Sequence, residues 1–250
     1  MSIILLLSRQ RSGTGALASV LERHPGIVYC GEVLDPTCEE RSFRRWLTER
    51  GSTIDEAIDQ PARFADFVDE LKAESQINLI DIKYNCLASI NPPFHSFLDV
   101  PWVLQILSML PVPIVHLRRS PLETYISAKI AERSGTYHTT EIFSFSEVVN
   151  VDIPELKNYL EICYREDRFF EKFFAGYSFH AAFDYETMIT SEGRVSAEVM
   201  ADLERLLSLD LSAIDTKPRF AKQAPVSLAG KIGNLPEVTA WLGKCEAFAA

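Results

Sequence analysis

A polar turn rich in arginine and glycine follows the first apolar run of the chain. The turn spans Ser8 to Ala16 and reads Ser-Arg-Gln-Arg-Ser-Gly-Thr-Gly-Ala. The apolar run Ile3 to Leu7 precedes it, and Leu17, Val20 and Leu21 follow it at helical spacing. This order predicts a strand, a tight turn and a helix, whose first-turn N–H groups and dipole attract anions. The turn therefore predicts a phosphate-binding loop, with an ordinary turn carrying solvated arginines as the alternative.

The residue types within this loop suit a phosphate in different ways. Glycine lets the backbone approach an anion closely, and arginine adds a full charge with forked donors. The residues expected to contact the anion are Arg9, Arg11, Ser12, Gly13, Thr14, Gly15 and Ala16. The loop lacks the Gly-Lys-Ser/Thr ending with which P-loop nucleotide triphosphatases hold the outer phosphates and magnesium. Since the sequence also offers no carboxylate cluster for magnesium, we expect no metal.

A second basic turn follows a later apolar run, Val112 to Leu117. It reads Arg118-Arg119-Ser120-Pro121 and comes at the end of a predicted strand, where open α/β sheets bind their ligands. In a helix that begins at Pro121, Ser127 would lie about 10 Å along the axis. Arg119 and Ser127 could therefore hold one phosphate beside that helix. The alternative is a basic turn that only caps the edge of the sheet.

Strand-like and helix-like segments alternate along the chain. The expected strands are 3–7, 27–30, 77–82, 112–117 and 177–185. The expected helices are 14–24, 42–49, 61–74, 102–110, 121–133, 154–174 and 196–207. This alternation predicts an α/β fold, in which a P-loop-like three-layer α/β/α arrangement surrounds a central, mainly parallel sheet. With 250 residues and no linker, we expect a single domain over 1–250.

Overall composition limits the kinds of binding partner and the cellular compartment that we expect. The formal net charge is −10, which disfavours long-range attraction to nucleic acids. The five cysteines are odd in number and show no paired spacing, which argues against a disulfide framework and a zinc site. The N-terminal apolar run is too short for a signal peptide, and no stretch has the apolar length of a membrane span. We expect a soluble cytoplasmic protein with no integral membrane segment and no nucleic-acid partner.

Taken together, the motifs and their order resemble sulfotransferases that use 3′-phosphoadenosine 5′-phosphosulfate (PAPS), of the bacterial carbohydrate type that includes nodulation-factor and trehalose sulfotransferases. The turn from Arg11 to Thr14 resembles the 5′-phosphosulfate loop of this family. Arg119-Ser120-Pro121 with Ser127 resembles its 3′-phosphate motif, and Tyr185-Glu186 its Tyr-Glu step near the adenine. Further similar residues are His24-Pro25, Gly31-Glu32-Val33-Leu34, Lys83, Lys222-Gln223, Asn234 and Glu237.

The resemblance implies roles for individual residues. Glu32 would be the general base for an acceptor hydroxyl, with His24 and His116 as rivals that are more typical of a helix-end cap and a core residue. Arg11 and the loop N–H groups would stabilise the leaving 5′-phosphate, as an oxyanion hole does. Lys222 and Gln223 would meet the donor if their segment closes over it. Lys83 would position the acceptor or Glu32, or be a strand-end charge.

The expected function is transfer of a sulfuryl group from PAPS to a hydroxyl of a carbohydrate, a glycolipid or another small acceptor. Acceptor selection would lie in Asp35 to Ala73 and Ser134 to Asn150, where the family likeness is least. Two other functions stay open at this point: a P-loop kinase of small molecules, and a non-catalytic nucleotide-binding protein that keeps the fold.

Overall fold

The computed structural model describes two compact units of the chain. The described residues are 2–35, 37–38, 41–52, 59–90, 100–110, 112–135, 148–219 and 228–244. The sheet unit comprises Met1–Arg118 and Tyr177–Lys217, and the helical unit comprises Arg119–Gly176 and Pro218–Ala250. Each unit is described by itself, and the expectation of a single domain stays a prediction.

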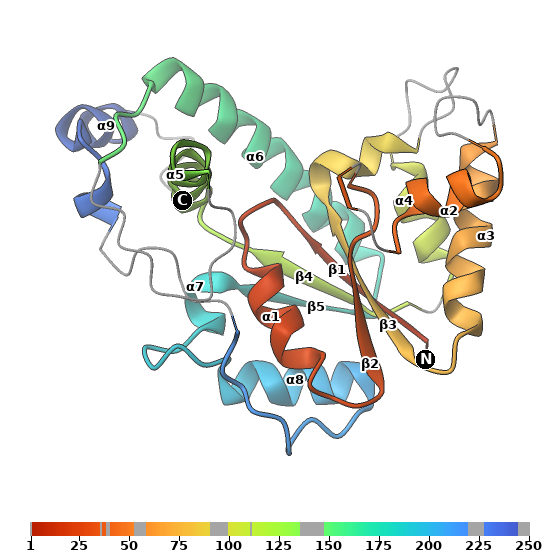
Figure 1. Cartoon of the computed structure of the whole chain (residues 1–250). Helices are drawn as coiled ribbons and strands as arrows, with labels where there is room; N and C mark the ends of the chain where they lie inside the picture. The colour runs from red at the N-terminus through yellow and green to blue at the C-terminus, as the bar shows by residue number, and fades with distance from the viewer. Residues whose placement is uncertain are drawn as a thin grey trace. The chain divides into compact units, whose positions relative to one another are not determined.

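A five-stranded parallel sheet forms the centre of the sheet unit (Figure 1). Its strands are β1 (Ile3–Ser8), β2 (Ile27–Glu32), β3 (Ile77–Lys83), β4 (Ile114–Arg118) and β5 (His180–Asp184), in the order β2-β3-β1-β4-β5. All four neighbouring pairs are parallel. Every residue of β1 is buried, which explains why its sequence is continuously apolar rather than alternating. The α/β fold with a central parallel sheet is therefore confirmed.

Helices cover both faces of this sheet. Helices α1 (Thr14–Leu21) and α8 (Ala197–Leu207) share one apolar core with Ile4 and Leu6 of β1. Helices α3 (Gln60–Ala73) and α4 (Trp102–Ser108) lie in crossovers that run across the sheet in the direction opposite to that of α1. Because such crossovers are right-handed, α3 and α4 cover the other face, which confirms the three layers.

Short elements complete the sheet unit. Helix α2 (Phe43–Glu49) begins at Ser42, whose side chain accepts a hydrogen bond from the Arg45 N–H. A 3₁₀ helix, η1 (Tyr84–Ser89), follows β3, and the four-residue helix α7 (Tyr185–Met188) follows β5. Neither η1 nor α7 was expected from the sequence, because segments this short carry no periodicity to read.

The helical unit is built from α5 (Pro121–Ser134), α6 (Ile153–Ala175), the 3₁₀ helix η2 (Leu228–Lys231) and α9 (Leu235–Leu242). Its core contains apolar residues of α5, α6 and α9: Tyr125, Ile126, Ile130, Leu156, Leu160 and Val238. Asn234 fixes the start of α9, because its side-chain amide accepts from the Val151 N–H at 2.8 Å and donates to the Val151 carbonyl at 2.9 Å. Helix α9 was missed in the sequence, which predicted no element there.

Three predicted features fall wholly or partly outside the described residues. These are the donor-contacting pair Lys222 and Gln223, residues 136–147 of the Ser134 to Asn150 segment, and residues 36, 39–40 and 53–58 of the Asp35 to Ala73 segment. No helix in the described part of the chain is long and apolar enough to cross a membrane.

Candidate active site

The predicted phosphate loop joins β1 to α1 in an unusual backbone conformation. Gly13 is the N-cap of α1 with φ of 87°, and Arg11 has φ of 64°, in the left-handed region that non-glycine residues rarely adopt. Because Gly13 has no side chain, none caps the first-turn N–H groups from that position. The Gly13 carbonyl accepts from the N–H groups of Ala16 and Leu17. A strained, glycine-capped helix start is the arrangement by which backbone donors bind an anion.

The loop residues divide by burial. Arg11, Gly13, Gly15 and Ala16 are partly exposed, so their backbone and the Arg11 guanidinium can reach a ligand. The side chains of Arg9, Ser12 and Thr14 are buried. The Arg9 guanidinium carbon lies 5.5 Å from the centroid of the Tyr84 ring. The sequence grouped all seven residues together, and the contact of each with an anion stays a prediction.

Tyr185 packs directly against the loop. A Cβ atom placed on Gly13 would lie 2.3 Å from Cδ2 and 2.5 Å from Cε2 of the Tyr185 ring. Tyr185 is the first residue of α7 and follows β5 at once, so the sheet delivers its ring to the loop. The structure thus brings together two motifs that are far apart in the sequence. The expected role of Tyr185 near an adenine stays a prediction.

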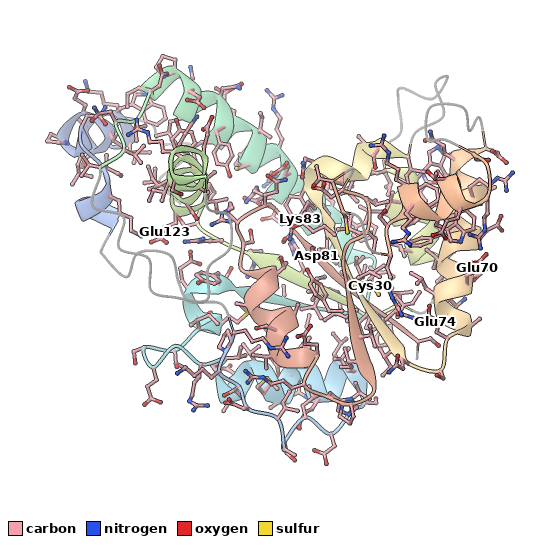
Figure 2. All side chains as sticks on the ribbon, viewed as in Figure 1. Cys30, Glu70, Glu74, Asp81, Lys83 and Glu123 are labelled. Carbon is pink, nitrogen blue, oxygen red and sulfur yellow. The ribbon has the colours of Figure 1, made fainter. Side chains whose placement is uncertain are left out.

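A buried ammonium group, that of Lys83, connects the loop to the candidate base. Figure 2 labels Lys83 and its neighbour Asp81. Lys83 ends β3, its side chain is 3% exposed, and its Nζ donates to Thr14 Oγ1 at 2.5 Å and to Asp81 Oδ2 at 2.7 Å. The same Nζ donates to Ser8 Oγ at 3.4 Å and lies 3.6 Å from Glu32 Oε1. The Lys83 ammonium therefore lies where it can position Glu32, which was one of the roles that the sequence left open for it.

A β-bulge aims the carboxylate of Glu32. The register between β2 and β3 shifts between Tyr29 and Gly31, and Gly31 has φ of 77°. Bulges of this kind re-aim side chains beside active sites. Burial raises the pKa of the Glu32 carboxyl above its ordinary value, the Lys83 ammonium opposes this rise, and the carboxylate of Asp81 adds to it. The Glu32 side chain is still 30% exposed, so this more basic carboxylate can meet an acceptor.

Asp81 is a buried member of the candidate site that sequence reasoning missed. It is 1% exposed, and its Oδ2 accepts from Lys83 and from the Tyr29 hydroxyl at 3.3 Å. Its Oδ1 is buried and has no hydrogen-bond partner among the described residues. A signal for it existed, because a lone carboxylate inside the apolar strand 77–82 precedes Lys83 by two residues, and residues two apart share one face of a strand.

Neither rival histidine is placed to act as a base. The His24 Nδ1 accepts from the Gly26 N–H at 3.1 Å, which makes His24 the helix-end cap that its position predicts. The His116 ring is buried and its Nε2 is hydrogen-bonded to the Tyr84 hydroxyl. Burial, with the nearby Arg118 charge, lowers the pKa of His116 to about 3. His116 is therefore a neutral core residue, as expected.

Arg118 of the second basic turn ends β4 in the sheet unit, whereas Arg119, Ser120 and Ser127 belong to the helical unit. The Arg119 guanidinium forms an ion pair with Glu123 at 3.1 Å, and the two side chains are 10% and 25% exposed. Ser120 is the N-cap of α5 and accepts from the Glu123 N–H, while Ser127 is partly buried on the same helix. The contact with Glu123 was not foreseen, because Arg119 precedes the N-cap of α5 and the four-residue spacing rule of helices does not reach it. Binding of one phosphate by Arg119 and Ser127 stays a prediction.

Comparison with known proteins finds similarity among solved structures only. Neither a protein-family model nor a curated protein sequence matches the chain. Among solved structures, the chain is similar to the mouse sulfotransferase SULT7A1 complexed with PAP, with 19% sequence identity and a TM-score of 0.42. The aligned region covers 84% of this chain and 59% of that chain, so the chain spans less than two thirds of its neighbour.

The sheet unit thus offers two chemical functions side by side. A glycine-capped helix start with Arg11 can stabilise an anion, and Glu32 can accept a proton. Lys83 touches Thr14 of the loop and lies near Glu32, so one buried cation joins the two functions. Over the described ranges, no group of three or more histidine, cysteine, aspartate or glutamate side chains could hold a metal ion.

Proposed function

We propose that this chain is a PAPS-dependent sulfotransferase that moves a sulfuryl group to a hydroxyl of a carbohydrate, a glycolipid or another small acceptor. The observation that carries the proposal is the link from Thr14 through Lys83 to Glu32, at 2.5 Å and 3.6 Å. Group transfer from a phosphate anhydride needs a site for the departing anion and a base for the incoming hydroxyl. The link holds candidates for both, and the family resemblance of the sequence indicates the donor.

In the proposed reaction, the acceptor oxygen attacks sulfur while Glu32 takes the hydroxyl proton. A new oxygen–sulfur bond forms, and the bond between sulfur and the 5′-phosphate oxygen breaks, so that 3′-phosphoadenosine 5′-phosphate (PAP) departs. Arg11 and the N–H groups from Ser12 to Gly15 stabilise the charge that develops on the departing phosphate, whereas the Ala16 N–H, which was also expected there, donates to the Gly13 carbonyl. Arg11 acts only electrostatically, because a guanidinium does not give up its proton in proteins. A sulfuryl group carries less charge than a phosphoryl group, so the reaction relies less on a metal clamp.

The remaining donor contacts in the proposal rest mainly on the sequence and its family resemblance. They are Arg119 and Ser127 for the 3′-phosphate, Tyr185 near the adenine, and Lys222 with Gln223 at the phosphosulfate. The closeness of the Tyr185 ring to Gly13 supports a place for Tyr185 beside the donor. The proposal names the acceptor only by its chemical class. The segments expected to select it, Asp35 to Ala73 and Ser134 to Asn150, are those with the least family likeness.

A transfer assay with matched variants tests the proposal. Wild-type protein is incubated with PAPS carrying labelled sulfate and a panel of sugars and glycolipids, with EDTA present. We expect label on at least one acceptor, and we expect Glu32→Gln to bind PAP normally while transfer falls by roughly 10²–10⁴-fold, the usual contribution of a general base. Transfer undiminished in Glu32→Gln would remove the base assignment.

The two other functions give different results when the same acceptor panel is also incubated with ATP and magnesium in place of PAPS and EDTA. A small-molecule kinase would transfer the terminal phosphate of ATP and leave PAPS untouched. A non-catalytic nucleotide-binding protein would bind PAP and transfer nothing to any acceptor. Either result would contradict the proposed activity.

A further inference from the structure

We infer that Asp81 is a positioning residue, whose buried carboxylate holds the Lys83 ammonium between Glu32 and Thr14 and thereby sets how tightly Glu32 binds a proton. The inference rests on the proposed function, in which Glu32 is the base. Asp81 itself is too deeply buried to touch an acceptor, since it is 1% exposed. It would act through Lys83, with which it forms the closest ion pair in this cluster at 2.7 Å.

The sheet fixes the geometry of this pair. Asp81 and Lys83 are two residues apart on β3, so their side chains leave the same face of the strand. Asp81 is in register with Glu32 of the neighbouring strand β2. Tyr29, also on β2, donates its hydroxyl to the same Asp81 oxygen that accepts from Lys83. Two adjacent strands thus determine where the ammonium lies.

Lys83 is shared unequally between two carboxylates. Its Nζ lies 2.7 Å from Asp81 Oδ2 and 3.6 Å from Glu32 Oε1. A cation stabilises the ionised form of a nearby carboxyl, and a second anion does the opposite. By engaging the ammonium and adding its own negative charge, Asp81 makes Glu32 a stronger base than Lys83 alone would allow.

Other titratable groups also lie around Glu32 and affect how tightly it binds a proton. The pKa of Glu32 is influenced by Lys83 and Asp81 of β3 and by Asp35 of the turn that follows β2. The Glu32 carboxylate in turn raises the pKa of Tyr29 of β2 and of Cys86 of η1. Asp35 follows β2 on the same chain segment and has no ion pair with Lys83 among the described residues. Asp81 is the carboxylate that both contacts Lys83 directly and stands in register with Glu32.

A carbon NMR titration of the glutamate carboxyls tests the inference without requiring turnover. The Glu32 signal is assigned with Glu32→Gln, and its midpoint is compared in wild type, Asp81→Asn, Asp81→Glu and Tyr29→Phe. We expect Asp81→Asn to lower the midpoint by about one pH unit, the lower end of the effect of a close charge. Asp81→Glu keeps the charge and should restore a midpoint near that of the wild type. Tyr29→Phe removes a hydrogen bond but no charge and should shift the midpoint much less.

A folded Asp81→Asn protein, judged by near-ultraviolet circular dichroism, that titrates at the wild-type midpoint would overturn the inference. If that variant does not fold, the nitrogen resonance of the Lys83 ammonium in wild type gives the second measurement, with Lys83→Arg for its assignment. A fixed ammonium with slow proton exchange and coupling to the Asp81 carboxylate is expected, and a freely rotating ammonium would overturn the inference.

The outcome is separable from the proposed function. If wild type transfers no sulfuryl group but the Glu32 midpoint still depends on Asp81, the proposed activity fails and the positioning role stands. If transfer occurs, the acidic limb of the kcat/KM profile should move to lower pH in Asp81→Asn, in step with the NMR midpoint. An acidic limb that stays in place while transfer continues would count against Asp81.

Discussion

The ring of Tyr185 occupies the space that any side chain on Gly13 would need. A Cβ atom at Gly13 would lie 2.3 Å from the Tyr185 ring, and the Gly13 φ of 87° independently favours glycine. The start of α1 and the start of α7 are therefore fitted to each other, although the two residues are far apart in the sequence. The glycine that suits an anion-binding loop is also required by the packing beneath it.

Replacing Gly13 by alanine should cost more stability than the same change at another glycine of positive φ that lies in open space. Gly51 is the matched control, because its φ is 72° and nothing lies within 4 Å of its added Cβ. We expect about 1–2 kcal/mol of destabilisation for Gly51→Ala from backbone strain, and roughly 1–3 kcal/mol more for Gly13→Ala from the clash. Urea unfolding measures both. Equal losses would show that the Tyr185 ring yields freely, and Gly13→Ala with Tyr185→Leu should recover part of the excess.

Replacing Arg11 by glycine should preserve or raise the stability of the protein while lowering its transfer activity. Its φ of 64° is strained for arginine, so Arg11→Gly should unfold at the same or a higher urea concentration than wild type. Transfer should nevertheless fall by roughly 10²–10³-fold, as when an oxyanion-hole donor is removed. Ser208→Gly is the control, because Ser208 has φ of 52° at the end of α8 and should gain stability with unchanged transfer. Full transfer by Arg11→Gly would remove Arg11 from the mechanism.

Glu123 should compete with a phosphate for Arg119. Its carboxylate forms an ion pair with the Arg119 guanidinium at 3.1 Å in a largely buried position. Glu123→Gln should therefore strengthen PAP binding by about two- to fivefold, equivalent to roughly 0.5–1 kcal/mol. Glu132→Gln is the control on the same helix, since Glu132 pairs with Lys129 at an exposed position. Calorimetric PAP binding that is unchanged by Glu123→Gln, or weakened by it, would argue against Arg119 as a phosphate ligand.

His116 should make the protein sensitive to acid. Its pKa is lowered from 6.5 to about 3 in the folded state, mainly by burial. The unfolded state therefore binds a proton first, and stability is lost as pH falls below about 6.5, by up to about 1.4 kcal/mol per pH unit. His116→Gln should flatten this part of the stability profile, measured by urea unfolding at successive pH values. Tyr84→Phe is the control, because it keeps the buried imidazole and should retain the slope of stability against pH. Equal slopes in wild type and His116→Gln would contradict the account.

Part of the fold could be predicted because its first strand, β1, is a continuous apolar run. β1 is buried along its whole length, so its apolar run from Ile3 to Leu7 predicts a parallel strand without reference to the neighbouring strands. Helix α9 has no such local pattern. Only Val238 of its eight residues is fully buried, and its first turn is held by the Asn234 clamp on Val151, more than eighty residues earlier. A contact over that separation leaves no local pattern.

The candidate site was predictable only in part for the same reason. Glu32 and the loop could be identified from their order along the chain and from family likeness. Their connection through Lys83 depends on β3 lying between β2 and β1 in the sheet, which is a property of strand order rather than of sequence order. Asp81 was missed because a buried carboxylate acquires meaning only from the neighbours that face it across the sheet.

The most direct test of the central claim is calorimetric binding of PAP in EDTA, compared with binding of ATP in magnesium. The proposed sulfotransferase should bind PAP without metal and more tightly than ATP with magnesium, and Arg11→Gly should weaken PAP binding. Preference for ATP with magnesium, or PAP binding that requires a metal, would contradict the account and favour a small-molecule kinase.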